Sequence, residues 1–203
     1  YFSGKIQSDL VAHLPKDQSH YLKDVMRLKA GDIFSIFNSQ GEWKSSIQNY
    51  EKQAVKIKVL EKLRDKKNEK NIWLAFTPIK QNPLNFMIQK GTELGVQKFI
   101  PILSERTAVK DINVERIKKI IIESAEQSNR ISIPEITKLE TLKNFMSSFP
   151  ENGCLVFCDI NCDKSNLSNI LSKKDLGPIC ILIGPEGDFS ENERKLIINL
   201  DQS

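Results

Sequence analysis

The spacing of apolar and polar positions changes near residue 65, and this change divides the chain into two parts. Before it, short segments alternate apolar and polar residues with the two-residue period of β-strands; they cover 32–37, 42–50 and 54–60. The turn residues Asn38-Ser39-Gln40-Gly41 separate the first two segments, and a helical spacing over 20–28 precedes them. Short strands at such close spacing predict a small β-barrel.

After the change, apolar strands alternate with amphipathic helices. Strands are predicted over 72–77, 98–103, 154–159 and 179–183, and helices over 82–95, 113–129, 141–149, near 167–171 and over 191–200. Asn82 followed by Pro83 predicts a helix start and Gly95 the end of that helix. Ser190 with Glu193 three residues later predicts a capping box. Near-continuous apolar strands alternating with helices predict an α/β domain with a parallel sheet covered on both faces.

The segment Arg64–Lys70 contains no apolar residue and is predicted to be an exposed linker. We therefore expect two domains, a β-barrel over 1–66 and the α/β domain over 71–203. Ligands of parallel sheets bind at the carboxyl ends of the strands. The candidate loops are consequently 77–82, 103–110, 159–164 and 184–190.

Composition narrows the possible chemistry. Of 203 residues, 39% are hydrophobic and 28% are charged, which is typical of a globular protein with a real core. No apolar run has the length of a membrane span and no signal segment opens the chain, so we expect a cytoplasmic protein that does not enter a membrane. The chain has two histidines and four cysteines without a Cys-x-x-Cys pair, which disfavours a Ser–His–Asp triad, a metal site and a disulfide scaffold. Cys154 and Cys158 are expected to be small buried apolar residues.

The positive charge is uneven. Residues 1–70 contain 14 basic and 9 acidic residues, whereas the remainder contains 16 and 17. A basic first part favours a polyanionic partner that contacts it, although a solvated lysine-rich surface would give the same count.

Three motifs could carry chemistry, and each has an ordinary structural interpretation. Gly184-Pro185-Glu186-Gly187 leaves a buried strand, but it is neither a dinucleotide nor a phosphate-loop motif and is also typical of a tight strand-to-helix turn. Ser104-Glu105-Arg106-Thr107 follows the second strand of the α/β part. Glu126 and Arg130 are four residues apart, as in many surface ion pairs.

Together, four ordered blocks over nearly the whole chain resemble the RsmE-like enzymes, which methylate uridine N3 in bacterial small-subunit (16S) ribosomal RNA. They are His20-Tyr21-Leu22-x-x-Val25-Met26-Arg27-Leu28-x-x-Gly31-Asp32; Lys90-Gly91-Thr92-Glu93-Leu94-Gly95-Val96 with Pro101 and Ser104-Glu105-Arg106; Glu123-Ser124-Ala125-Glu126-Gln127-Ser128-x-Arg130 with Ile133-Pro134; and Ile183-Gly184-Pro185-Glu186-Gly187-x-Phe189-Ser190-x-x-Glu193.

The resemblance implies an RNA-binding PUA-like barrel followed by a SPOUT methyltransferase domain with a C-terminal trefoil knot. It also implies S-adenosylmethionine as the methyl donor, a homodimer with active sites near the subunit interface, and ribosomal RNA or the assembled small subunit as substrate. Two departures stand out. Asp188 takes the place of a usual glycine, and the sequence ends at Ser203, before a Leu-Gly-x-Arg-Ile-Leu-Arg-like segment. We therefore expect the knot to be incomplete in this chain.

Candidate residues are assigned to roles, and the resemblance implies those that bind the donor. Those expected to hold the donor are Phe157, Cys158, Asp159, Ile183, Gly184, Pro185, Glu186 and Gly187. Arg106 and Arg130 are candidates for stabilising negative charge on the uracil or for binding phosphate, and Glu186 or Glu126 for accepting the N3 proton. RNA affinity is expected from Lys23, Arg27, Lys29, Lys44 and Lys52, with Lys56 and Lys58.

Two other classes of function were considered. A non-catalytic RNA-binding paralogue of the same fold is the main alternative, and Asp188 together with the missing tail supports it. A small-molecule oxidoreductase lacks a dinucleotide fingerprint.

Overall fold

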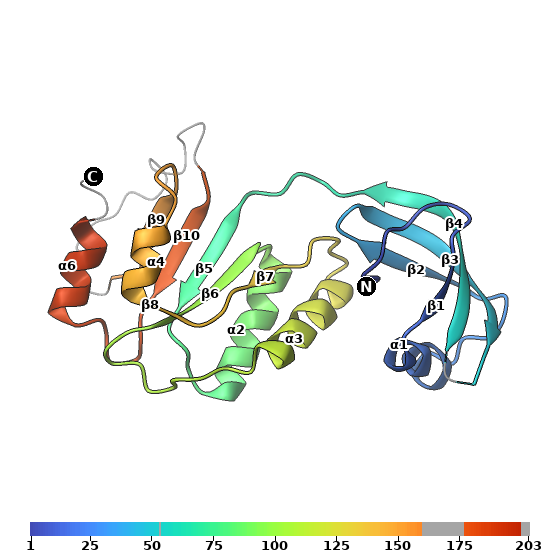
Figure 1. Ribbon diagram of the computed structural model, residues 1–203, viewed down its shortest axis with the longest axis horizontal. Helices are drawn as coiled ribbons and strands as arrows, with labels where there is room; N and C mark the ends of the chain where they lie inside the picture. Colours follow the sequence, from blue (N-terminus) through green and yellow to red (C-terminus); the bar gives the residue numbers. More distant parts are fainter. Residues whose placement is uncertain (53, 160–176, 200–203) are drawn as a thin grey trace. The chain divides into compact units, whose positions relative to one another are not determined.

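A computed structural model of the chain describes residues 1–52, 54–159 and 177–199 (Figure 1). The chain divides into two compact units, Tyr1–Asn68 and Glu69–Ser203. The first is built on an antiparallel sheet and the second on a parallel sheet flanked by helices, so the predicted α/β class is confirmed. Among the described residues, no helix combines the length and apolar character needed to cross a membrane.

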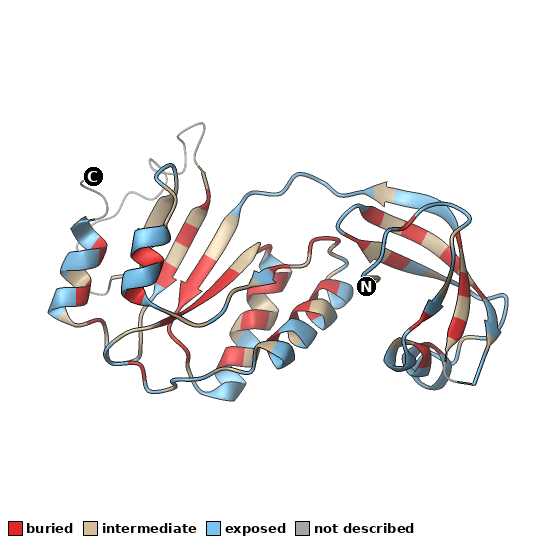
Figure 2. Ribbon diagram, viewed as in Figure 1, coloured by how far each residue is buried: buried red, intermediate tan, exposed pale blue. Residues whose placement is uncertain are grey.

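Unit 1 contains a four-stranded antiparallel sheet in the order β1-β4-β3-β2. Its elements are β1 (Val11–Leu14), α1 (Lys16–His20), the π-helix η1 (Tyr21–Val25), β2 (Ile33–Asn38), β3 (Gly41–Tyr50) and β4 (Val55–Asp65). Buried and partly exposed residues alternate along β3 and β4 (Figure 2). The core of the unit contains Trp43, Ile47, Val55, Ile57 and Val59, which places the predicted apolar face inside.

The predicted strands of unit 1 are found, with two differences. Strand β1 was not predicted, because its sequence Val-Ala-His-Leu does not alternate apolar and polar residues, and the apolar Val11 is exposed. Strand β4 continues to Asp65, beyond the predicted end at residue 60. Its extension pairs with the start of β3, where Arg64 Nε lies 2.5 Å from a carboxylate oxygen of Glu42.

Unit 2 contains a parallel sheet in the order β7-β6-β5-β10-β9, with β8 paired to β6. Its elements are β5 (Ile72–Phe76), α2 (Gln81–Leu94), β6 (Lys98–Leu103), α3 (Val114–Gln127), β7 (Glu135–Ile136), β8 (Glu140–Thr141), α4 (Leu142–Ser148), β9 (Cys154–Phe157), β10 (Ile179–Ile183) and α6 (Glu191–Asn199). The helix predicted near 167–171, and Cys162, lie outside the described residues.

Helices cover both faces of this sheet, as predicted. Leu74 and Phe76 of β5 pack with α2 and α3, whereas Ala75 between them packs with α4 and α6. Because successive side chains of a strand point to opposite faces of the sheet, β5 contributes residues to two hydrophobic cores. Each core lies between one face of the sheet and the helices that cover it (Figures 1 and 2).

Helix α2 begins at Gln81, two residues before Pro83, which was the predicted first helical residue. Its N-cap is Lys80 rather than Asn82, so Pro83 lies within the first turn, where a missing N–H breaks no intrahelical hydrogen bond. The predicted end is confirmed: Gly95 has φ +99°, a left-handed conformation that favours glycine.

The prediction that Cys154 and Cys158 are buried is wrong for Cys158 and is not fully met by Cys154, which is partly exposed; the fully buried cysteine is Cys180, for which no prediction was made. Cys180 is buried, and burial raises the pKa of its thiol to about 12. Cys158 is exposed, contrary to the prediction, because β9 ends at Phe157 and Cys158 lies in the loop that follows.

Candidate functional site

The parallel strand order brings the predicted ligand loops to one edge of unit 2. The strands β6, β5, β10 and β9 are consecutive neighbours, so their carboxyl ends lie side by side; residues 160–164 of the candidate loop after β9 lie outside the described residues. Thr77, just after β5, donates its N–H to the carbonyl of Ile183 at the end of β10, with N and O 3.2 Å apart. We call this the carboxyl edge of unit 2.

Arg106 connects two of these loops. It lies in the loop after β6, and its Nη1 donates to the carbonyl oxygen of Gly187 in the loop after β10, at 2.8 Å. The alkyl part of Arg106 lies along Gly187: a Cβ built there would be 3.8 Å from Arg106 Cδ. Arg106 therefore holds the glycine loop by both a hydrogen bond and a van der Waals contact.

Glu193 makes a second connection between the same loops. Its Oε1 accepts from the N–H of Glu105 at 2.8 Å, and its Oε2 accepts from the N–H of Ser190 at 3.0 Å. Ser190 Oγ in turn accepts from the N–H of Glu193 at 3.3 Å, so the predicted capping box is confirmed. Only 9% of Glu193 is exposed, and its carboxylate is used entirely in holding backbone groups.

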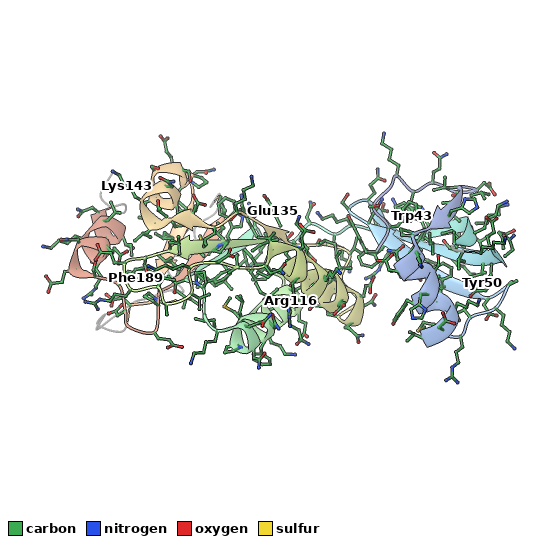
Figure 3. All side chains as sticks on the ribbon, turned by 60° about the horizontal axis from the view of Figure 1, so that its bottom comes forward. Trp43, Tyr50, Arg116, Glu135, Lys143 and Phe189 are labelled. Carbon is green, nitrogen blue, oxygen red and sulfur yellow. The ribbon has the colours of Figure 1, made fainter. Side chains whose placement is uncertain are left out.

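The loop after β10 is shaped by an aromatic ring and by an unusual backbone conformation. A Cβ on Gly184 would lie 2.7 Å from the ring of Phe189, which packs against Phe157 with ring centroids 5.6 Å apart (Phe189 is labelled in Figure 3). Asp188 has φ +59°, in the left-handed region that favours glycine, and its Oδ1 accepts from the N–H of Phe189 at 2.7 Å. This conformation gives a physical reason for the glycine expected at position 188.

The loop after β9 is fastened to α6. Asp159 Oδ2 accepts from Arg194 Nη2 at 2.5 Å, and the side chain of Asp159 is only 10% exposed. Its carboxylate thus serves at least in part as an anchor for this edge of the sheet. This ion pair has no local signal in the sequence, because its partners are 35 residues apart.

The predicted donor-binding residues therefore gather at the carboxyl edge, on the loops after β9 and β10. Glu186 and Gly187 are exposed there, and Ile183 is 41% exposed at the end of a central strand. The N–H groups of Glu186 and Gly187 form no hydrogen bond within the described ranges. An apolar side chain beside free backbone donors suits a ligand that has both a flat apolar ring and polar groups.

Arg130 lies elsewhere. Its Nη2 is 2.7 Å from Oε1 of Glu69, and its guanidinium contacts Gly95, at the end of α2. Both partners precede the starts of β5 and β6, so Arg130 lies at the amino edge of the sheet. Glu126, in the last turn of α3, is exposed. Within one chain, Arg106 and Glu186 therefore lie at the carboxyl edge of the sheet, whereas Arg130 and Glu126 lie at the amino edge.

Glu69 was not singled out in the sequence, yet it has a shifted pKa. Burial opposes its ionisation, but the nearby Ser132 hydroxyl, the Arg130 guanidinium and a hydrogen bond from Gln97 together lower its pKa. The Gln97 amide nitrogen lies 2.6 Å from Oε2 of Glu69.

The predicted RNA-binding residues belong to unit 1. Lys23, Arg27, Lys29 and Lys52 are exposed, whereas Lys44 is partly buried and lies 3.2 Å from Glu61. Lys23 Nζ lies 5.9 Å from the centre of the Tyr50 ring, which connects η1 to the end of β3. Lys52 follows β3 directly.

Comparisons with known proteins match both parts of the chain to RNA methyltransferases. Residues 66–201 match the family model described as an RNA methyltransferase domain, and residues 14–60 match an RNA methyltransferase PUA domain. Ribosomal RNA small subunit methyltransferase E of Rickettsia conorii is 30% identical over 97% of this chain and 81% of its own length. The enzyme of the same name from Bacillus subtilis is 28% identical over 91% of this chain and 77% of its own length.

Solved structures show the same fold. Ribosomal RNA small subunit methyltransferase E of Neisseria gonorrhoeae, bound to S-adenosyl methionine, superposes with a TM-score of 0.88 at 22% identity, covering 99% of this chain and 85% of that one. A methyltransferase of Legionella pneumophila in complex with the cofactor SAM gives a TM-score of 0.85 at 26% identity, covering 97% and 83%.

Proposed function

Since the chain belongs to the family of RNA methyltransferases that includes ribosomal RNA small subunit methyltransferase E, we propose that it methylates N3 of a uridine in small-subunit (16S) ribosomal RNA. The methyl donor is S-adenosylmethionine. The observation that carries the proposal is the Arg106–Gly187 contact, which holds an exposed glycine loop at the carboxyl edge. The contact holds the loop after β6 against the loop after β10, so that both border the same part of the carboxyl edge.

The residues at this edge fit the proposed donor. A side chain at position 187 would meet nothing closer than 3.8 Å in the part of the chain that the structure describes, and no contact there requires glycine. Its absence leaves room for a ligand to approach the backbone. Ile183 can contact the adenine ring, and the N–H groups of Glu186 and Gly187 can donate to the polar groups of the donor. Bound there, S-adenosylmethionine supplies a methyl group activated by its positive sulfur.

Arg106 has two tasks in this proposal. Nη1 holds Gly187, while the other guanidinium N–H groups are able to stabilise the negative charge on a uracil that loses its N3 proton. Glu186, on the same edge and exposed, is the proposed proton acceptor. Glu126 is less suited within one chain, because it lies at the amino edge.

The proposed assembly is a homodimer acting in the cytoplasm on ribosomal RNA or the small subunit during ribosome biogenesis. The proposal is supported by the resemblance, which implies active sites near a subunit interface. A catalytic role for Arg130 stays a prediction, and it would require a second copy to bring Arg130 near Arg106. Unit 1 is proposed to supply RNA affinity through Lys23, Arg27, Lys29, Lys44 and Lys52.

The test is methylation by the full chain. The protein is incubated with labelled S-adenosylmethionine and either small-subunit ribosomal RNA or isolated small subunits, and the nucleosides are separated to detect 3-methyluridine. The expected result is one methyl group at one uridine, lost in Arg106→Ala. A chain that binds the RNA but shows no heat on titration with S-adenosylmethionine would instead be the non-catalytic paralogue.

A further inference from the structure

Three apolar side chains on the surface of unit 1 are about half exposed and none of them belongs to its buried core. Tyr21, Val25 and Met26 belong to η1 and the residue after it, and they are 48%, 58% and 51% exposed. The α1–η1 segment is coloured largely as exposed in Figure 2. Leu22, by contrast, is buried in the core and anchors the segment. We call Tyr21, Val25 and Met26 the η1 apolar surface.

The backbone around this surface is held in a defined conformation. The N–H of Met26 donates to the carbonyl of Tyr21 at 2.9 Å, and the N–H of Leu28 donates to the carbonyl of Leu22 at 3.0 Å. Between them, Arg27 has φ +55°, which costs a non-glycine residue about 1 kcal/mol. Tyr50, labelled in Figure 3, fixes the end of the segment by donating its hydroxyl to the carbonyl of Leu28. The exposed side chains therefore stand on a rigid support.

Cations surround these apolar side chains. Lys23 and Arg27 lie within or beside η1, Lys29 follows it, and none of the three forms an ion pair within the described ranges. The neighbouring carboxylates are already used: Asp24 Oδ2 lies 2.6 Å from His20 Nδ1, and Asp32 accepts from the N–H of Lys29 at 2.8 Å. An apolar surface bordered by free cations is complementary to a nucleic acid with exposed bases.

We infer that the η1 apolar surface contacts unpaired bases of the RNA while Lys23 and Arg27 hold the adjacent phosphates. The inference rests on the proposed function and extends it, because it names single-stranded RNA as the form that unit 1 binds. Tyr21 offers a ring on which a base stacks, and Val25 and Met26 cover the apolar edge of a base. Stacking does not release counterions, so this part of the affinity is independent of salt.

The experiment separates stacking from charge. Binding of the full chain to a fluorescent single-stranded RNA and to a duplex of the same sequence is measured at several salt concentrations. Tyr21→Ala is expected to weaken single-strand binding by roughly 5- to 100-fold with an unchanged salt slope. Lys23→Ala is expected to reduce the salt slope by about 0.7. Val11→Ser, which changes an exposed apolar residue on β1, is the matched control and should bind within about twofold of the wild type.

Circular dichroism of each variant establishes that it is folded. The inference is overturned if folded Tyr21→Ala binds single strands as tightly as the wild type, or if it loses single-strand and duplex binding equally. A change of oligomeric state in Tyr21→Ala, measured by sedimentation, would assign the surface to a second copy of the chain and also overturn it. Failure of the proposed function is a separate result: RNA binding with the expected variant effects but without methylation.

Discussion

The guanidinium of Arg106 donates from Nη1 to the carbonyl oxygen of Gly187 at 2.8 Å, which joins two loops that are 81 residues apart in the sequence. The contact uses one of five N–H groups and leaves others for a ligand. An arginine at this position therefore both shapes the glycine loop and carries a positive charge beside it.

Replacing Arg106 by Ala is expected to reduce methyl transfer more than donor binding. We expect kcat to fall about 100-fold or more, because a charge-stabilising donor is lost. Affinity for S-adenosylmethionine should fall by less than about tenfold, since only one hydrogen bond to the loop is removed. Single-turnover kinetics and calorimetry measure the two quantities. Lys119→Ala removes an exposed positive charge on α3 and serves as the control, and unchanged turnover in Arg106→Ala would remove Arg106 from the site.

Glu193 is the second connection, and its removal should affect stability. Glu193→Ala leaves the N–H groups of Glu105 and Ser190 without their acceptor, which is expected to cost about 1–3 kcal/mol in free energy of unfolding. Donor affinity should fall as well, because both loops lose a support. Urea unfolding and calorimetry test these expectations. Glu191→Ala, in the exposed first turn of the same helix, should change stability by less than about 0.5 kcal/mol, and an equal effect of both variants would contradict the bridging role.

Of the contacts that Glu193 makes, only the local one could be predicted from the sequence. Its bond with Ser190 was predictable, because a capping box depends on residues three apart. Its bond with Glu105, 88 residues away, depends on how β6 and β10 are placed in the sheet and has no local signal. The ion pair between Glu69 and Arg130 also has no local signal. From spacing alone, Glu126 was the more obvious partner for Arg130, because it is four residues away.

Regular elements were predicted more reliably than their ends. The strands β6 and β10 have the predicted bounds, since continuous apolar runs between polar loops are strong signals. The start of α2 was misplaced because Asn82 and Pro83 are both favourable near a helix start, although Pro83 fits equally well as the third residue of the first turn. Strand β1 depends on pairing with β4 rather than on its own pattern.

Position 188 offers a test of backbone strain. Asp188→Ala keeps the unfavourable φ of +59° and loses the acceptor for the N–H of Phe189, so it should be about 1 kcal/mol less stable than the wild type. Asp188→Gly relieves the strain while losing the same acceptor, so the two effects should nearly cancel. Asp188→Asn keeps an acceptor and tolerates the conformation, and it should match the wild type. Equal stabilities of the Ala and Gly variants in urea would show that the conformation carries no strain.

The same three variants address the alternative of a non-catalytic paralogue. If Asp188 had degraded the donor site, Asp188→Gly would bind S-adenosylmethionine much more tightly than the wild type. The proposed function instead expects donor affinity to differ by less than about threefold among wild type, Asn and Gly, because the side-chain acceptor of Asp188 is directed to its own loop.

The pair formed by Glu69 and Arg130 should make stability depend on pH. The folded state lowers the pKa of Glu69 from its usual value of 4.5, so the folded state favours the ionised carboxylate. The stabilisation is therefore fully present above the unfolded pKa and is lost as the pH falls through the lower, folded value. Glu69→Gln should be less stable than the wild type at neutral pH, and this difference should shrink below about pH 4.5. Glu135→Gln, on β7, is the exposed control.

A double-mutant cycle decides whether Arg130 acts only through this pair. If its role is to hold Glu69 and the end of α2, Arg130→Ala and Glu69→Gln should show a coupling energy of about 0.5–3 kcal/mol in urea unfolding. Both variants should then retain similar turnover when they are assayed well below their melting temperatures. If Arg130 stabilises charge on the uracil, Arg130→Ala should lose turnover while Glu69→Gln, which keeps the guanidinium, retains it. A loss of turnover in Arg130→Ala but not in Glu69→Gln would thus support a catalytic role for Arg130. That role would require a second subunit to bring Arg130 to the carboxyl edge.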